Sequence, residues 1–264
     1  MLLIIVTYLC VGAIAGVLAG LLGVGGGLVI VPMLVFCFTR QGLPHEAMMH
    51  LALGTSLASI VFTSVSSFWA HHKRGAVYWI AVLRIVPGIL AGTALGTFLA
   101  ARMSTGNLKG FFAVFLCFVA VQMLADRKPR PSRELPGWCG TSAVGTVIGI
   151  VSSLAGIGGG IMSVPFLLWC NLPVHRAIGT SAAIGFPIAV FTSAGYVLHG
   201  LQAATLPAYA VGYVYLPALA CIVPASVLMA PFGVRLAHRL PVRALKRVFA
   251  VLLIAVGTKM LWSL

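Results

Sequence analysis

The sequence predicts an all-α polytopic membrane protein that consists of two repeats with inverted topology. Three observations lead to this prediction: an apolar composition, a duplicated glycine-rich segment, and basic loops that change sides between the two halves. Of the 264 residues, 61% are hydrophobic and only 8% are charged, and the mean hydropathy is +1.10. A soluble domain of this size needs more charge to cover its surface. Several apolar stretches reach the roughly 20 residues that a helix needs to cross a bilayer.

The duplication is the clearest pattern in the chain. Segment 21–34, LLGVGGGLVIVPML, matches segment 154–167, LAGIGGGIMSVPFL. Each is followed by a GTS sequence, which begins at Gly54 in the first copy and at Gly179 in the second. These matches define the expected organisation, which is a first repeat (1–125), a polar cytoplasmic linker (126–137) and a second repeat (138–264).

Each repeat is expected to contain an apolar run, a glycine break, a short apolar run and three longer helices. The first repeat supplies these runs at 1–22, 28–38, 47–70, 77–101 and 107–125. The second repeat supplies them at 138–156, 161–171, 175–198, 204–234 and 244–262. The run 204–234 contains four prolines, so it is either one kinked helix or a helix with an added segment.

The short run 28–38 is too short to cross a membrane. As a helix it would measure about 16 Å, which is about half of the hydrocarbon core. Together with the run before it, we expect it to form a re-entrant or helical hairpin that adds no net crossing. The three further helices then give each repeat an odd number of crossings. The second repeat is therefore expected to lie upside down relative to the first.

The distribution of basic residues supports this inversion. The loop 71–75, HHKRG, is basic, whereas its counterpart 199–205 carries no lysine or arginine. In the other pair of loops, 235–247 is much more basic than 101–110. Because cytoplasmic loops collect Lys and Arg, we expect the basic loops and the linker in the cytoplasm and both termini outside.

Charge and cysteine usage limit the classes of partner. The chain has 17 lysines and arginines against 3 acidic residues, a net charge of +14. Membrane topology accounts for this excess, so nucleic acid is not an expected partner. The six cysteines form no CxxC pair and no Cys/His metal spacing, so no metal and no cofactor are expected. The expected partners are the lipid bilayer and a small anionic substrate; proton or ion coupling and a homo-oligomer are compatible with the sequence.

The glycine breaks are the candidate substrate site. A half-helix that restarts after a break presents free N–H groups and about half a positive charge, which suits an anion. Helix packing is the alternative role of the glycines, and bonding to the preceding turn is the alternative for the hydroxyls. The expected substrate-binding residues are Gly25, Gly26, Gly27, Thr55, Ser56, Arg84, Gly158, Gly159, Gly160, Thr180 and Ser181, with Pro32 and Pro165 shaping the half-helices.

Two ionisable residues within the predicted spans have alternative roles. Arg84 either adds positive potential at the site or extends to the cytoplasmic interface, because it lies only about seven residues into its run. His50 is either a proton carrier or a packed, hydrogen-bonded ring. No aspartate or glutamate lies inside a predicted span, so a carboxylate proton relay is excluded.

The duplicated pattern G-x-G-G-G-x(4)-P, followed by GTS, resembles the sulfite exporter TauE/SafE family of bacterial membrane transporters. The resemblance covers nearly the whole chain. It implies a multi-pass secondary transporter of the bacterial inner membrane that exports a small sulfur-containing or organic anion, such as sulfite, sulfoacetate or another sulfonate. A passive anion channel of the same architecture is the main alternative. An intramembrane serine hydrolase using Ser56 or Ser181 is disfavoured because no GxSG-type motif is present, so no enzymatic activity is expected.

Overall fold

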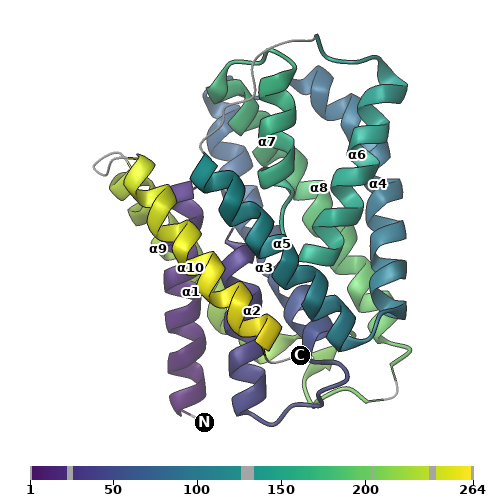
Figure 1. The fold of residues 1–264 in the computed structure, drawn as a ribbon, viewed down its shortest axis with the longest axis vertical. Helices are drawn as coiled ribbons and strands as arrows, with labels where there is room; N and C mark the ends of the chain where they lie inside the picture. Colours follow the sequence, from purple (N-terminus) through teal and green to yellow (C-terminus); the bar gives the residue numbers. More distant parts are fainter. Residues whose placement is uncertain (1, 23–25, 126–133, 204, 238–241, 263–264) are drawn as a thin grey trace.

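The computed structural model describes residues 2–22, 26–125, 134–203, 205–237 and 242–262. Within these ranges the chain forms a bundle of α-helices with one small pair of strands (Figure 1). The first half supplies α1 (Leu2–Leu22), α2 (Gly27–Arg40), α3 (Met48–Lys73), α4 (Trp79–Arg102) and α5 (Thr105–Ala125). The second half supplies α6 (Trp138–Ala155), α7 (Gly160–Trp169), α8 (Val174–Gly200), β1 (Ala210–Val211), β2 (Val214–Tyr215), α9 (Leu216–Ala237) and α10 (Val242–Trp262).

The helices have the length and the surface of a membrane protein. Among the described helices, α3, α4, α5, α6 and α8 are long and apolar enough to cross a bilayer. Large apolar side chains also face outward, because Leu83, Val114, Phe118 and Val121 each expose more than half of their surface. Such an outer surface is suited to contact with lipid. The protein is therefore an all-α, multi-pass membrane protein, as the sequence predicts.

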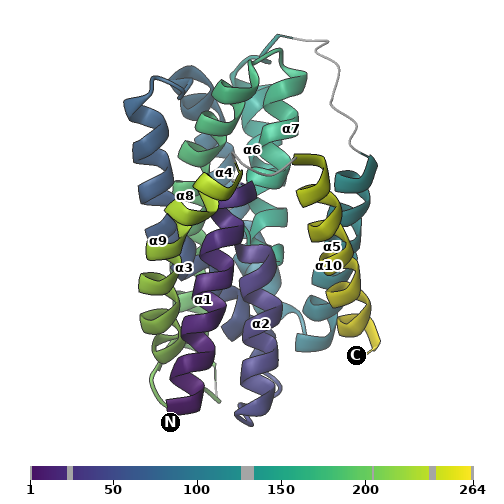
Figure 2. The ribbon, with the colours of Figure 1, turned by 90° about the vertical axis from the view of Figure 1, so that its left-hand side faces the viewer.

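Both predicted breaks are present. α1 ends at Leu22 and α2 starts at Gly27, whereas α6 ends at Ala155 and α7 starts at Gly160. In the two views α2 runs from the middle of the bundle to its lower end, and α7 runs from the middle to its upper end (Figures 1 and 2). Gly25 and residues 126–133 of the predicted linker lie outside the described residues.

The structure decides between the two alternatives for 204–234. β1 and β2 pair as an antiparallel hairpin, and α9 starts only at Leu216. The hairpin turns at Gly212, which has a φ of 55°, and Tyr209 just before it has a φ of 66°. A right-handed helix cannot continue through left-handed residues. The extra residues of the second copy are therefore an added segment between α8 and α9.

Helices from the two halves of the chain pack against each other in pairs. α1 lies along α9, α4 along α6, α3 along α8, and α5 along α10 (Figures 1 and 2). A Cβ atom on Gly16 of α1 would overlap the backbone of Ser226 in α9, and one on Gly92 of α4 would overlap that of Thr146 in α6. Small residues of this kind let membrane helices approach closely. Each half thus completes its packing with helices of the other half.

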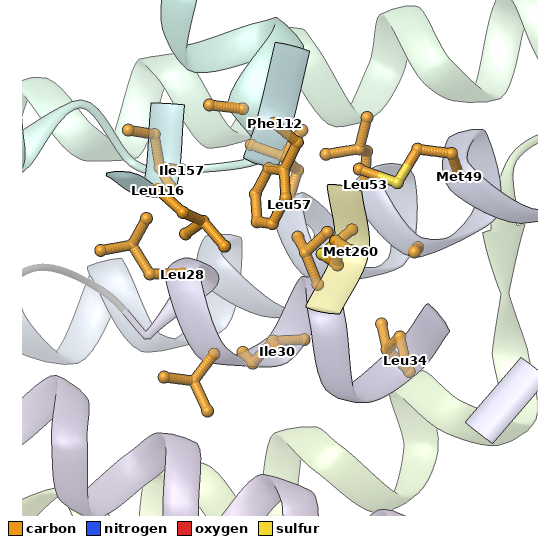
Figure 3. Packing of buried hydrophobic residues seen from close by; sticks show 14 of the residues in the cluster. Leu28, Ile30, Leu34, Met49, Leu53, Leu57, Phe112, Leu116, Ile157 and Met260 are labelled. Atoms are coloured by element: carbon orange, nitrogen blue, oxygen red, sulfur yellow. The ribbon is translucent and has the colours of Figure 1, made fainter. Parts of the chain in front are cut away.

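The short helix α2 is held in an apolar core (Figure 3). Leu28 and Leu34 of α2 pack with Leu53 and Leu57 of α3, and Ile157 from the second break lies in the same cluster. All five side chains are at most 2% exposed. The core therefore fixes α2 against α3 and brings the start of α2 to the second break.

Candidate substrate site at the two helix breaks

Each short helix begins after a glycine with a left-handed backbone. Gly26 precedes α2 with φ 73° and ψ −13°, and Gly159 precedes α7 with φ 75° and ψ −8°. This conformation costs a residue with a side chain about 1–2 kcal/mol, whereas glycine adopts it readily. Glycine at these positions therefore lets the chain turn sharply and restart a helix within the bundle.

The first turn of α2 leaves two backbone amides without an acceptor inside the helix. The amides of Val29 and Ile30 both donate to the carbonyl of Gly26, at 3.0 and 3.1 Å. The N–H groups of Gly27 and Leu28 have no acceptor within the helix, because the carbonyls four residues before them lie outside it. They point out of the helix start, where an external acceptor can bind.

The start of α7 has the same geometry. The amides of Met162 and Ser163 donate to the carbonyl of Gly159, at 3.1 and 3.0 Å, so the amides of Gly160 and Ile161 are left without an intrahelical acceptor. A helix N-terminus carries roughly half a positive charge. Both helix starts are therefore suited to binding an anion.

The two breaks lie against each other in the interior of the protein. A Cβ atom built on Gly27 would overlap the carbonyl oxygen of Gly156 and would lie 3.3 Å from the Cα atom of Ile157. Ser56 of α3 donates a hydrogen bond from its Oγ to the same Gly156 carbonyl, at 3.2 Å. The structure thus brings Gly27 and Ser56 from the first half to the glycine segment of the second half.

The second break is enclosed by α3 and α8. A Cβ atom on Gly158 would lie 3.3 Å from Cγ2 of Ile60 in α3. A Cβ atom on Gly185 of α8 would lie 2.9 Å from the carbonyl oxygen of Gly158. These contacts leave little room for a side chain at either position, so the glycines also provide close packing, which the sequence left open as their alternative role.

The threonines of the two GTS segments bridge the halves of the chain. Oγ1 of Thr55 accepts a hydrogen bond from the backbone N–H of Tyr215, just before α9, at 2.9 Å. Oγ1 of Thr180 accepts one from the backbone N–H of Tyr78, just before α4, also at 2.9 Å. Both threonines are fully buried. Because each hydroxyl acts as an acceptor here, its proton is available for a further acceptor.

Ser181 takes part in a chain of hydroxyls at the second break. Its Oγ lies 2.7 Å from Oγ of Ser163, and Ser163 donates to the carbonyl of Gly159 at 3.0 Å. Since Ser163 has only one hydroxyl proton, Ser181 is the donor in the shorter bond. This chain ties α8 to the residue that precedes α7.

Pro32 and Pro165 occupy equivalent positions inside α2 and α7. Proline has no N–H group, so the carbonyl four residues before it loses its partner within the helix. These carbonyls belong to Leu28 and Ile161, in the first turn of each helix. Each short helix therefore lacks one intrahelical hydrogen bond in its first turn, and the shaping role of the prolines stays a prediction.

The family model described as "Sulfite exporter TauE/SafE" matches residues 8–260. The chain belongs to this family. The match includes both glycine breaks and both GTS segments, so the resemblance that the sequence suggested is confirmed.

Similar curated proteins are named as transporters. A "Probable membrane transporter protein" of Haemophilus influenzae is 37% identical over 257 residues, which cover 97% of each chain. The probable membrane transporter protein MJ0441 of Methanocaldococcus jannaschii is 28% identical and covers 98% of this chain and 96% of its own. YunE of Bacillus subtilis, with the same description, is 26% identical. No solved structure gives a significant match. This TauE/SafE family chain is therefore a membrane transporter.

Arg84 of this TauE/SafE transporter lies apart from the two breaks. Its Nη1 donates to the carbonyl of Pro136 at 3.3 Å, and Oγ of Ser142 donates to the carbonyl of Arg84 at 2.8 Å. The part of α6 between Ser142 and Ala155 is about 20 Å long at 1.5 Å per residue. The structure thus places Arg84 near the start of α6, whereas the glycine break follows the end of that helix.

His50 adopts the packed arrangement. Its Nε2 lies 2.9 Å from the carbonyl oxygen of Ala100, to which it donates, and its ring stacks on Tyr213 with 4.9 Å between centroids. The side chain is buried. Of the two roles that the sequence left open, the structure supports the hydrogen-bonded ring.

The sequence did not single out two buried serines at the second break of the TauE/SafE chain. Ser152 lies in the last turn of α6 and Ser163 lies in α7, and both are fully buried. Ser163 stands in the otherwise apolar run GIMSVPF, which is a signal that could have identified it. Ser152 had no such local signal, because its place beside α7 depends on the turn between the helices.

Proposed function

We propose that this protein is a secondary transporter that exports a small sulfur-containing or organic anion across the bacterial inner membrane by alternating access. The observation that carries this proposal is the contact between Gly27, at the start of α2, and Gly156, at the second break. This contact places the start of α2 against the turn that leads from α6 into α7. The amide donors and the positive potential of the two short helices at this turn are suited to one anion. Sulfite, sulfoacetate and other sulfonates carry several acceptor oxygens and fit such a set of donors.

The proposed transport cycle requires two repeats of inverted topology. It is supported by the opposite directions of α2 and α7, which both start in the middle of the bundle (Figures 1 and 2). It is also supported by the reciprocal hydrogen bonds of Thr55 and Thr180, each of which reaches into the other half. Rocking of one repeat against the other would expose the breaks to one side of the membrane at a time. A coupled proton or ion would drive the cycle, in a monomer or a homo-oligomer.

The predicted site residues have distinct roles in this proposal. The backbone of Gly25–Gly27 and Gly158–Gly160 binds the anion, and Gly25 is included on its sequence alone. Thr55 and Thr180 have hydroxyl protons to donate, whereas Ser56 and Ser181 use theirs on the protein and hold the breaks in place. Arg84 adds positive potential at the end of the bundle near Pro136 and attracts the anion toward the protein.

A passive anion channel of the same architecture would use the same breaks and differs only in its energetics. The hydrolase alternative gains no support in the described part of the chain, because Ser56 bonds to a backbone carbonyl and Ser181 to another serine. The relatives, too, are named as transporters.

The experiment that tests the proposal uses purified protein in liposomes. Labelled sulfite, sulfate, taurine and sulfoacetate are offered one at a time, with and without an imposed pH or ion gradient. We expect one or more of the sulfur anions to accumulate against its own gradient when the driving gradient is present. Flux that only dissipates an existing anion gradient would identify a channel, and the absence of flux for all four would contradict the proposal.

A further inference from the structure

One hydroxyl at the second break has no hydrogen-bond partner among the residues that the structure describes. Among the residues that the structure describes, two buried side-chain polar atoms lack a hydrogen bond: Oγ of Ser152 and Nδ1 of His50. Ser153, the next residue in α6, shows the usual arrangement, since its Oγ donates to the carbonyl of Gly149 at 2.8 Å. A buried polar group without a partner destabilises the folded protein. The hydroxyl of Ser152 is therefore available to bind a ligand.

The Ser152 hydroxyl faces the N-terminus of α7. Its Oγ lies 3.4 Å from the point that a Cβ atom on Gly159 would occupy, and Gly159 is the residue that precedes α7. The carbonyl of Ser152 accepts the amide of Ile157 at 3.2 Å, which fixes the serine at the turn between α6 and α7. The unpaired amides of Gly160 and Ile161 start from the same turn.

The first break has no hydroxyl at the equivalent positions. When the two copies are aligned, Ala19 corresponds to Ser152 and Ile30 corresponds to Ser163. The two breaks share their glycines, but only the second combines them with these buried serines. The pair of breaks is therefore chemically asymmetric.

The side chains around the second break set the charge of the ligand that it can hold. Those nearest to its glycines are Val31, Leu53, Ile60, Ile148, Ser152 and Ile188. They provide no counter-charge, so the positive end of α7 is the main electrostatic support for an anion there. The cost of removing an ion from water rises with the square of its charge, so this site favours a singly charged anion over a doubly charged one.

We propose that the second break alone binds the anionic head group, in a subsite formed by the amides of Gly160 and Ile161 and the hydroxyl of Ser152. This inference rests on the proposed transport function and narrows its site, because, of the two glycine segments proposed to bind the anion, only the second contacts the head group. The ligand is a monovalent oxyanion of the sulfonate or hydrogen sulfite type, whose several oxygens accept from all three donors. The first break packs against this subsite through Gly27 and completes it without binding the head group.

Replacing Ser152 separates a binding role from a structural one. Ser152→Ala removes a buried hydroxyl that has no partner in the described part of the chain, so the ligand-free protein should be as stable as the wild type or more stable. The same change removes a hydrogen bond to a charged ligand, worth about 1.5–3 kcal/mol, which corresponds to a loss of affinity of about tenfold or more. A serine that only supports the fold would lower the stability instead.

The test measures the binding of methanesulfonate and of sulfate to the full-length protein, purified in detergent, by titration calorimetry. The melting temperature is recorded with and without each anion. Ser153→Ala is the matched control, because Ser153 is the buried neighbour whose hydroxyl bonds to Gly149 and lies 3.2 Å from Oγ1 of Thr192. We expect Ser152→Ala to weaken methanesulfonate binding about tenfold or more without lowering the melting temperature. We expect Ser153→Ala to lower the melting temperature and to keep the wild-type affinity.

The other outcomes overturn the subsite in identifiable ways. Unchanged affinity in Ser152→Ala, or no methanesulfonate binding by the wild type, means that the hydroxyl does not bind the head group. Sulfate binding as tight as that of methanesulfonate contradicts the preference for a single charge. Binding that depends on Ser152, together with no flux in liposomes, would support the subsite and contradict transport. If Ser152→Ala keeps both its flux in liposomes and its affinity for methanesulfonate, the result would support transport and contradict the subsite.

Discussion

Thr55 accepts a hydrogen bond from the backbone N–H of Tyr215, and this bond crosses from the first half of the chain to the second. Thr180 accepts the corresponding bond from Tyr78 in the opposite direction, and both bonds measure 2.9 Å. Tyr215 directly precedes α9 and Tyr78 directly precedes α4. Each GTS segment therefore holds the backbone from which a helix of the other half begins.

The glycines of the GTS segments make the same reciprocal contact. A Cβ atom on Gly54 would overlap the carbonyl of Tyr213, and one on Gly179 would crowd the carbonyl of Ala76. A residue larger than glycine would push the adjacent threonine away from the tyrosine N–H group whose hydrogen bond it accepts. Glycine and threonine thus act together in both halves.

Removing either threonine acceptor should destabilise the protein by a similar amount. In Thr55→Val or Thr180→Val the tyrosine amide keeps its place but loses its acceptor, which costs about 1–3 kcal/mol. We expect both variants to melt at a lower temperature than the wild type in detergent. Thr258→Val is the control, because Thr258 is exposed and bonds to its own helix. Wild-type melting in both threonine variants, or a loss confined to one of them, would contradict the reciprocal role.

Gly27→Ala should separate the two breaks. Alanine favours a helix more than glycine does, so propensity alone predicts a more stable α2. The added Cβ overlaps the backbone of Gly156, which cannot move aside as a flexible side chain can. We therefore expect lower thermal stability and weaker anion binding, measured by calorimetry. Gly106→Ala in α5 is the control, since its nearest contact is Oγ of Ser104 at 4.0 Å; equal behaviour of the two variants would show that the breaks do not need this contact.

Arg84→Gln should change the rate of transport and leave the affinity alone. Arg84 lies near the start of α6, so it acts on the anion at a distance, and such steering is weakened by salt. We expect slower flux than in the wild type at low ionic strength and equal flux at high ionic strength. Arg102→Gln, at the other end of α4, is the comparison. A loss of affinity that persists at high salt would instead place Arg84 in contact with the substrate.

The features that the sequence predicted are local ones. Each glycine disfavours a helix by about 1 kcal/mol relative to alanine, so a triplet of glycines in an apolar run favours a break, and the breaks before Gly27 and Gly160 follow from the residues themselves. The shortness of α2 and α7 likewise follows from where polar residues resume along the chain. These two facts were enough to predict the half-helices and the candidate site.

The features that the sequence did not predict depend on contacts between distant segments. The partners of Thr55 and Thr180 are set by the exchange of helices between the halves, which no local pattern encodes. The position of Arg84 relative to the breaks could not be predicted, because it depends on the packing of the start of α6 beside Arg84. The strand pair before α9 arises from left-handed residues at Tyr209 and Gly212, and the first of these is not a glycine.

The most direct measurement of the central claim is sulfonate flux into liposomes by Gly159→Ala, compared with Gly42→Ala. Both glycines have a left-handed backbone, with φ of 75° and 67°, so alanine is strained at either position. A Cβ atom on Gly42 meets open space, whereas one on Gly159 would overlap Cδ1 of Ile188 and lie 3.4 Å from Oγ of Ser152, at the start of α7 where the anion is proposed to bind. We expect wild-type flux in Gly42→Ala and flux reduced about tenfold or more in Gly159→Ala, at equal amounts of inserted protein. Wild-type flux in Gly159→Ala would contradict the claim that the start of this helix binds the transported anion.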